Sequence, residues 1–118
     1  MAKIMIVDDA PYMRLLLRDF LFSANHEIVA EATNGVEAVQ LYKLHRPDLV
    51  TMDMTMPEKD GISALKEIRE FDSSAKVIMC SAMGQKQMVL DAILAGAKDF
   101  IVKPFQKEMV INAISRAL

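Results

Sequence analysis

Short apolar runs alternate with amphipathic segments five times along the 118-residue chain. Three of the runs are continuously apolar, which is typical of strands whose two faces are both covered. Runs of this length, separated by longer segments of helical spacing, predict strands that alternate with helices. The expected strands span residues 3–7, 27–32, 49–52, 77–80 and 100–102.

The segments between these strands carry apolar residues three and four positions apart, which predicts amphipathic helices. Asn34 is a candidate N-cap for the second helix, with Glu37 as its capping-box partner. The fourth helix is expected over 85–95, and Gly96 is placed to end it. Short connections predict right-handed crossovers, hence an α/β fold with a doubly wound, five-stranded parallel sheet. The expected apolar stripes are Met13, Leu16, Leu17, Phe20 and Leu21, with Arg14, Arg18 and Asp19 off the stripe; Ile62, Leu65 and Ile68; and Val110, Ala113, Ile114 and Ala117.

Polar side chains stand where the predicted strands end. Asp8-Asp9 follows the first strand, Asp53 the third, Ser81 the fourth and Lys103 the fifth. In an open α/β sheet these ends meet in one crevice, where clustered carboxylates repel one another unless a cation binds. Oxygen ligands of this kind suit Mg²⁺. Acceptors for Mg²⁺ opposite donors for oxyanions indicate a phosphoryl site, with Asp53 as the candidate nucleophile.

Composition restricts which kinds of protein remain possible. A chain of 118 residues that is 53% hydrophobic and 25% charged fits one globular domain, expected over 1–118. The net charge of −2 without a basic stripe argues against direct nucleic-acid binding. No run is long enough for a membrane span or signal peptide. The single Cys80 fits a reducing compartment, so we expect a cytoplasmic protein, and we expect a monomer.

Four segments resemble the motifs of response-regulator receiver domains. They are Ile6-Val7-Asp8-Asp9, Asp53-Met54-Thr55-Met56-Pro57 with Asp60-Gly61, Ser81-Ala82, and Val102-Lys103-Pro104-Phe105. The resemblance covers the whole chain and is greatest to the stand-alone chemotaxis members of the family, through Ser81-Ala82-Met83-Gly84-Gln85 and Ala95-Gly96-Ala97-Lys98-Asp99-Phe100. It implies the flavodoxin-like strand order 2-1-3-4-5 and a cis Lys103–Pro104 bond.

The resemblance also implies roles for the polar cluster. Asp53 is expected to accept a phosphoryl group from a histidine kinase. Asp9, Asp53 and the backbone carbonyl of Thr55 are expected to ligate Mg²⁺, with Asp8 reaching it through water. Lys103 is expected to contact a phosphoryl oxygen. The chain is therefore expected to be a signalling phosphoacceptor rather than an enzyme.

Two further residues are expected to act as a switch. Ser81 would move to hydrogen-bond a phosphoryl oxygen, and Phe100 matches the aromatic residue that then turns inward. On the fourth helix, Met88, Ala92 and Ile93 are expected to face the sheet. Leu90 and Leu94 fall on the opposite side and predict an apolar ledge beside Phe100 and the fifth helix, where an output partner docks. The resemblance points to the flagellar motor switch as that partner, and a phosphatase is another candidate partner.

Three alternatives stay open at this point. The first is a single-domain phosphorelay intermediary, which sequence separates poorly from motor control. The second is a haloacid-dehalogenase-type phosphatase, which needs a second acid where this chain has Thr55. The third is a flavin- or nucleotide-binding domain, against which none of the four glycines forms a phosphate-cradling loop after the first strand. Neither Thr55 nor Met83 supplies an amide or carboxylate that would orient a hydrolytic water.

Overall fold

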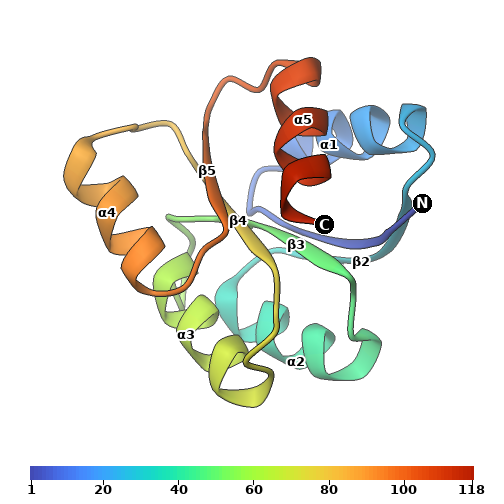
Figure 1. Ribbon diagram of the computed structural model, residues 1–118. Helices are drawn as coiled ribbons and strands as arrows, with labels where there is room; N and C mark the ends of the chain where they lie inside the picture. Colours follow the sequence, from blue (N-terminus) through green and yellow to red (C-terminus); the bar gives the residue numbers. More distant parts are fainter.

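Five parallel strands form a sheet in the order β2-β1-β3-β4-β5, which confirms the predicted doubly wound, flavodoxin-like arrangement. The computed structural model describes residues 1–118, and Figure 1 shows how its strands and helices alternate. The Lys103–Pro104 peptide bond is cis, as the family resemblance implied. In chain order the elements are β1 (Lys3–Val7), α1 (Pro11–Ser23), β2 (Glu27–Ala32), α2 (Gly35–His45), β3 (Leu49–Asp53), α3 (Gly61–Phe71), β4 (Val77–Ser81), α4 (Lys86–Leu94), β5 (Asp99–Val102) and α5 (Lys107–Ala117).

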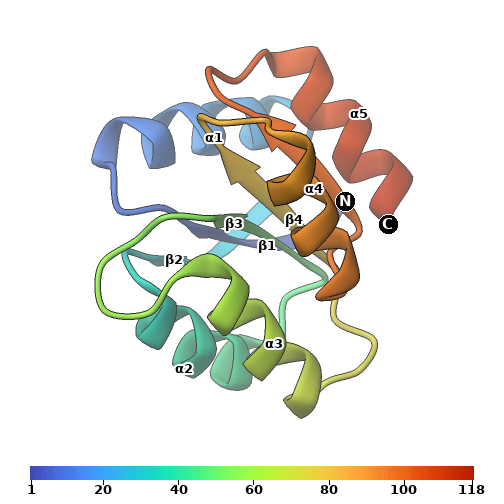
Figure 2. The same ribbon diagram turned by 90° about the vertical axis from the view of Figure 1, so that its left-hand side faces the viewer.

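Side chains alternate between the two faces of the sheet, and each face is covered by its own set of helices. Figure 2 shows α1 and α5 on one side of the sheet and α2 and α3 on the other. Apolar residues of α4, with Ala92 fully buried, pack on the α2 and α3 side. Because both faces are covered, the central strands are buried throughout, as their continuous apolar runs predicted. No helix is long and apolar enough to cross a membrane.

The sheet extends one residue further than the apolar runs indicated. β3 includes Asp53 and β4 includes Ser81, because backbone pairing continues past the last apolar side chain. Asp53 lies opposite Cys80, and Ser81 lies opposite Val102. The Lys103 N–H donates to the Ser81 carbonyl at 2.8 Å. The backbone of two predicted site residues is therefore fixed by the sheet itself rather than by loops.

The predicted N-cap of α2 and the glycine stop after α4 are found, with differences in detail. The fourth helix, expected over 85–95, spans Lys86–Leu94, and Gln85 and Ala95 are its caps. Asn34 Oδ1 accepts a hydrogen bond from the Glu37 N–H at 2.9 Å, so Asn34 is the N-cap of α2. The Glu37 carboxylate, however, accepts from the N–H and hydroxyl of Thr33 instead of returning to Asn34. Gly96 follows α4 with a φ of +108°, a conformation that costs glycine little.

Candidate functional site

The carboxyl ends of β1 and β3 bring three carboxylates together. Asp8 and Asp53 are buried, whereas Asp9 is exposed. One oxygen of each of Asp8, Asp9 and Asp53 lies within 4.8 Å of the others. Asp8 is held by its own N–H, which donates to the Ala32 carbonyl of β2 at 3.1 Å. Its Oδ1 accepts from the Ala10 N–H at 2.9 Å, which fixes the carboxylate as α1 begins.

Lys103 follows β5, the outermost strand of the sheet, and its side chain reaches the carboxylates at the ends of β1 and β3. Its Nζ donates to Asp8 Oδ2 at 2.7 Å and lies 3.3 Å from Asp53 Oδ1. Burial by itself lowers the Lys103 pKa, but the hydrogen bond to Asp8 and the charges of Asp53 and Asp8 outweigh it and raise that pKa. Lys103 is therefore a charged ammonium that partly neutralises two buried carboxylates.

The surroundings of Asp53 disfavour the ionised form of its carboxyl group. Burial, together with the negative charge of Asp8, raises its pKa from 3.8 to about 6, although the Lys103 ammonium acts in the opposite direction. A carboxylate in such a place is poorly solvated and carries its charge near neutral pH only at a cost. Groups perturbed in this way by burial and specific neighbours are typical of functional sites.

The other predicted site residues lie on β4, on β5 and in the loop after β3. The Ser81 side chain is buried, and its Oγ accepts a hydrogen bond from the Met83 N–H at 3.1 Å. Phe100 is half-buried on β5 and packs against the core cluster that α2, α3 and α4 share. Thr55 is exposed, and its carbonyl accepts no backbone hydrogen bond. The four strand ends that the sequence singled out therefore meet at one edge of the sheet, with the free Thr55 carbonyl in the loop after β3.

These residues fit a hard divalent cation. Three carboxylates and an unpaired backbone carbonyl are oxygen donors of the kind that Mg²⁺ and similar ions prefer. Two of the carboxylates share one lysine, so the buried negative charge is only partly balanced. A cation bound here would offset the burial and the repulsion by Asp8 that together raise the Asp53 pKa.

The family model "Response regulator receiver domain" matches residues 4–115. The chain belongs to the response-regulator receiver domain family. It is 62% identical over 116 residues to the chemotaxis protein CheY of Bacillus subtilis, covering 98% of this chain and 97% of that protein. It is 57% identical over 114 residues to CheY of Thermotoga maritima, covering 97% and 95%.

A solved structure agrees with this assignment. The CheX-CheY-BeF3-Mg²⁺ complex from Borrelia burgdorferi contains a chain that superimposes with a TM-score of 0.94 at 42% identity, covering 97% of this chain and 87% of that one. The protein is therefore a CheY-like receiver domain of two-component signalling. Such proteins are signalling proteins rather than catalytic enzymes, as the sequence predicted.

The α4 helix of this receiver domain differs from the expectation in one residue. Met88 is half-buried and Ala92 is buried as predicted, but Ile93 is 45% exposed and does not face the sheet. The buried stripe of α4 runs through Met88, Ala92 and Ala95, and Ile93 is turned out of it because it stands one position, about 100° around the helix, from Ala92. Leu90 and Leu94 are exposed, as expected.

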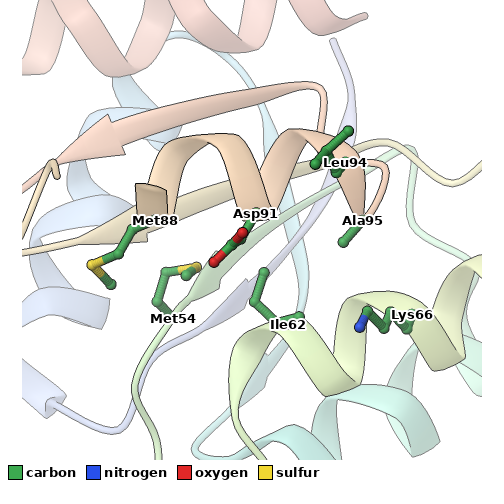
Figure 3. A pocket seen from close by; sticks show the side chains of 7 residues that line it. All are labelled: Met54, Ile62, Lys66, Met88, Asp91, Leu94 and Ala95. Atoms are coloured by element: carbon green, nitrogen blue, oxygen red, sulfur yellow. The ribbon is translucent and has the colours of Figure 1, made fainter. Parts of the chain in front are cut away.

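Leu94 is the last residue of α4 and is one of the residues that line a cavity between α4 and α3. The cavity has a volume of about 380 Å³. Figure 3 shows Leu94 at the end of α4, with Met54 and Ile62 below that helix. Phe100 instead borders a separate hollow that α5 residues line. Leu94 and Phe100 therefore border different hollows. The role of the predicted ledge as a partner face stays a prediction.

One charged residue at the site was missed by the sequence pattern, which placed Arg14 only on the polar side of the first helix. In the structure the Arg14 Nη1 donates to the Asp8 carbonyl at 2.7 Å. The only sequence signal was its position six residues after Asp8, one turn into the helix that follows the acidic pair. Periodicity cannot show that a polar side chain folds back to the preceding loop.

Proposed function

We propose that this receiver domain accepts a phosphoryl group on Asp53 from a phosphorylated histidine of a kinase, with Mg²⁺ at the acidic cluster. The observation that supports this most directly is the buried Asp53 carboxylate between two further carboxylates and the Lys103 ammonium. Asp9, Asp53 and the Thr55 carbonyl are the proposed ligands, with Asp8 acting through water. The magnesium and beryllofluoride named in the Borrelia complex are consistent with this chemistry.

The transfer is a single displacement at phosphorus. An Asp53 Oδ atom forms a bond to phosphorus while the P–N bond to the kinase histidine breaks, and the histidine nitrogen keeps that electron pair. Lys103 already lies 3.3 Å from Asp53 Oδ1, so its ammonium can move to a phosphoryl oxygen without crossing the site. When bound, Mg²⁺ neutralises negative charge on the phosphoryl oxygens.

Transfer changes the surroundings of Ser81. Its hydroxyl accepts from the Met83 N–H, so its own proton is free to be donated to a new acceptor. A phosphoryl oxygen on Asp53 is such an acceptor at the neighbouring strand end. We propose that Ser81 moves toward it and that Phe100 follows inward, which repacks the surface beside α4 and α5.

The output is proposed to be chemotactic, with the flagellar motor switch as partner. The CheY names of relatives at 62% and 57% identity support this over other receiver outputs. We also propose a cytoplasmic location, because the single cysteine, Cys80, is buried and unpaired. A partner that prefers the phosphorylated arrangement must in return stabilise phosphorylation, because the coupling is reciprocal.

The test is phosphorylation of the purified protein by the small donor acetyl phosphate, with and without Mg²⁺. We expect a mass gain of one phosphoryl group that requires Mg²⁺ and is reversed by hydroxylamine, as for an acyl-phosphate. Asp53→Asn should abolish the gain, and the exposed Asp19→Asn should leave it intact. A modification that persists in Asp53→Asn would place the phosphoacceptor elsewhere.

A further inference from the structure

A network of three charged side chains holds the loop between β1 and α1 from the side of β2. Arg18 makes a bidentate pair with Glu31, with distances of 2.9 and 3.0 Å. The other member, Arg14, lies with its Nε 3.5 Å from Glu31 Oε1 and its Nη1 2.7 Å from the Asp8 carbonyl. Arg14 is the least exposed of the three. We call Arg14, Glu31 and Arg18 the arginine–glutamate network.

The network acts on the peptide that joins Asp8 to Asp9. The Asp8 side chain has its own partners, the Ala10 N–H and Lys103, so it does not need Arg14 for its orientation. Asp9 is exposed, and neither its N–H nor its carboxylate makes a hydrogen bond within the chain. The Arg14 bond to the Asp8 carbonyl is therefore a direct hydrogen bond to this peptide group, and it adds to the restraint from the Asp8–Ala10 turn. The plane of the peptide sets the direction in which the Asp9 side chain leaves the backbone.

We propose that Arg14 is a positioning residue for cation binding, which holds Asp9 toward Asp8 and Asp53 before the cation arrives. Glu31 and Arg18 keep the guanidinium aimed at the carbonyl. This inference rests on the metal site of the proposed function. Outer partners that orient metal ligands commonly change metal affinity about 10- to 100-fold when they are lost.

The charge of Arg14 makes the proposal unusually easy to test. A guanidinium beside the cluster repels an incoming cation, so an electrostatic role alone predicts tighter Mg²⁺ binding once the charge is removed. A positioning role predicts weaker binding, because the Asp9 carboxylate must then be ordered at the moment of binding. The two roles therefore differ in the sign of the effect of one substitution.

The experiment is a titration of the full chain with Mg²⁺ alone. Binding is measured by calorimetry and by the NMR chemical shifts of the backbone amides. In Arg14→Met, which keeps an unbranched apolar stem but loses the charge and the donors, we expect Kd for Mg²⁺ to rise about tenfold. Arg116→Met is the matched control, because it removes the same charge from an exposed pair with Asp99 on α5. Its Kd should equal that of the wild type.

Arg14→Lys is the second variant, since it keeps the charge but cannot contact Glu31 and the carbonyl with the same paired geometry. We expect its Kd to lie between those of the wild type and Arg14→Met. An Arg14→Met protein that binds Mg²⁺ as tightly as the wild type, or more tightly, overturns the positioning role. Absence of saturable Mg²⁺ binding by the wild type would instead remove the metal site of the proposed function.

If Arg14→Met fails to fold, circular dichroism without Mg²⁺ will show it, and Arg14→Lys then decides the proposal. A folded Arg14→Lys with wild-type Kd overturns it, because the paired guanidinium contacts to Glu31 and the Asp8 carbonyl would then not be needed for tight binding. A weaker Kd supports it.

Discussion

Lys103 and Asp8 are 95 residues apart in the chain, and their side chains meet at 2.7 Å. The same ammonium lies 3.3 Å from Asp53, so the two buried carboxylates share it unequally. Asp8 also receives the Ala10 N–H, whereas Asp53 receives only the longer contact to Lys103. Burial, together with the charge of Asp8, therefore raises the Asp53 pKa to about 6, and the single contact with Lys103 offsets only part of that rise.

Removal of the Asp53 charge should stabilise the metal-free protein. At neutral pH, Asp53→Asn is expected to raise the free energy of unfolding by about 1–3 kcal/mol, because a carboxylate whose pKa is raised by burial destabilises the native state when ionised. Urea unfolding in chelator measures this. The exposed Asp19→Asn, which changes net charge equally, should stay near the wild-type value.

The stability that Asp53→Asn adds should decrease as the pH is lowered. The folded pKa of Asp53, about 6, lies above its ordinary value of 3.8, so the native state takes up the proton first as pH falls. The penalty is therefore complete above pH 6 and is relieved as pH falls through the folded pKa toward the unfolded one. The advantage of Asp53→Asn should shrink over that window, and an advantage that grows on acidification would contradict the assignment.

Loss of the lysine should be costly. Lys103→Met leaves the buried Asp8 and Asp53 carboxylates without a cation, and we expect the free energy of unfolding to fall by about 3 kcal/mol without Mg²⁺. Arg116→Met removes the same charge from an exposed pair and should change stability by less than about 1 kcal/mol. Addition of Asp8→Asn to Lys103→Met should recover part of the loss, and strict additivity of the two changes would rule out their coupling.

A methyl group at Gly61 should displace the backbone of Asp53. A Cβ there would lie 2.1 Å from the Asp53 carbonyl oxygen, which is backbone and cannot move aside without shifting β3. Gly61→Ala should lower stability by about 2 kcal/mol or more in thermal and urea unfolding. Gly84→Ala is the comparison, because its Cβ would meet only the side chain of the exposed Val102, which can rotate. Equal losses in both variants would contradict this account.

The lifetime of the acyl-phosphate should respond to residue 55. Hydrolysis needs a water directed in line at phosphorus, and the exposed Thr55 offers no amide to hold it. Thr55→Asn is expected to speed loss of the phosphoryl group from the purified phosphoprotein, followed by mass spectrometry after donor removal. Ser115→Asn on α5 introduces the same amide at an exposed position and should leave the rate unchanged. Equal or slower decay in Thr55→Asn would count against a water-positioning role.

The partner face on α4 can be tested with charge. Leu90→Glu and Leu94→Glu together should weaken binding of the beryllofluoride-treated protein to a motor-switch component, while phosphorylation of Asp53 by acetyl phosphate stays intact. Leu44→Glu is the control, since Leu44 on α2 is 74% exposed and Leu94 is 76% exposed. Binding that survives the double substitution would move the docking face away from these leucines, for example to the exposed Ile93.

The pattern of the chain was sufficient for the architecture and for most element boundaries. Continuous apolar runs predicted buried parallel strands, because a strand covered on both faces has no solvent-exposed side and therefore no alternating polar residues. Asn34 and Gly96 predicted helix ends, because capping depends on local backbone groups. The strand ends at Asp53 and Ser81 were each one residue off, since backbone pairing with β4 and β5 continues where side-chain polarity has already changed.

The sequence by itself determined which groups stand at the carboxyl ends of the strands. The alternation of strands and helices makes all strands parallel, so these ends lie on the same side of the sheet. Only the tertiary structure decided how they compensate one another: that Lys103 prefers Asp8 over Asp53, and that Arg14 turns back to the Asp8 carbonyl. It also decided that Ile93 reaches the surface and that Leu94 borders α3. These outcomes depend on distances between elements that are far apart in the chain, and the spacing of residues along one element carries no information about them.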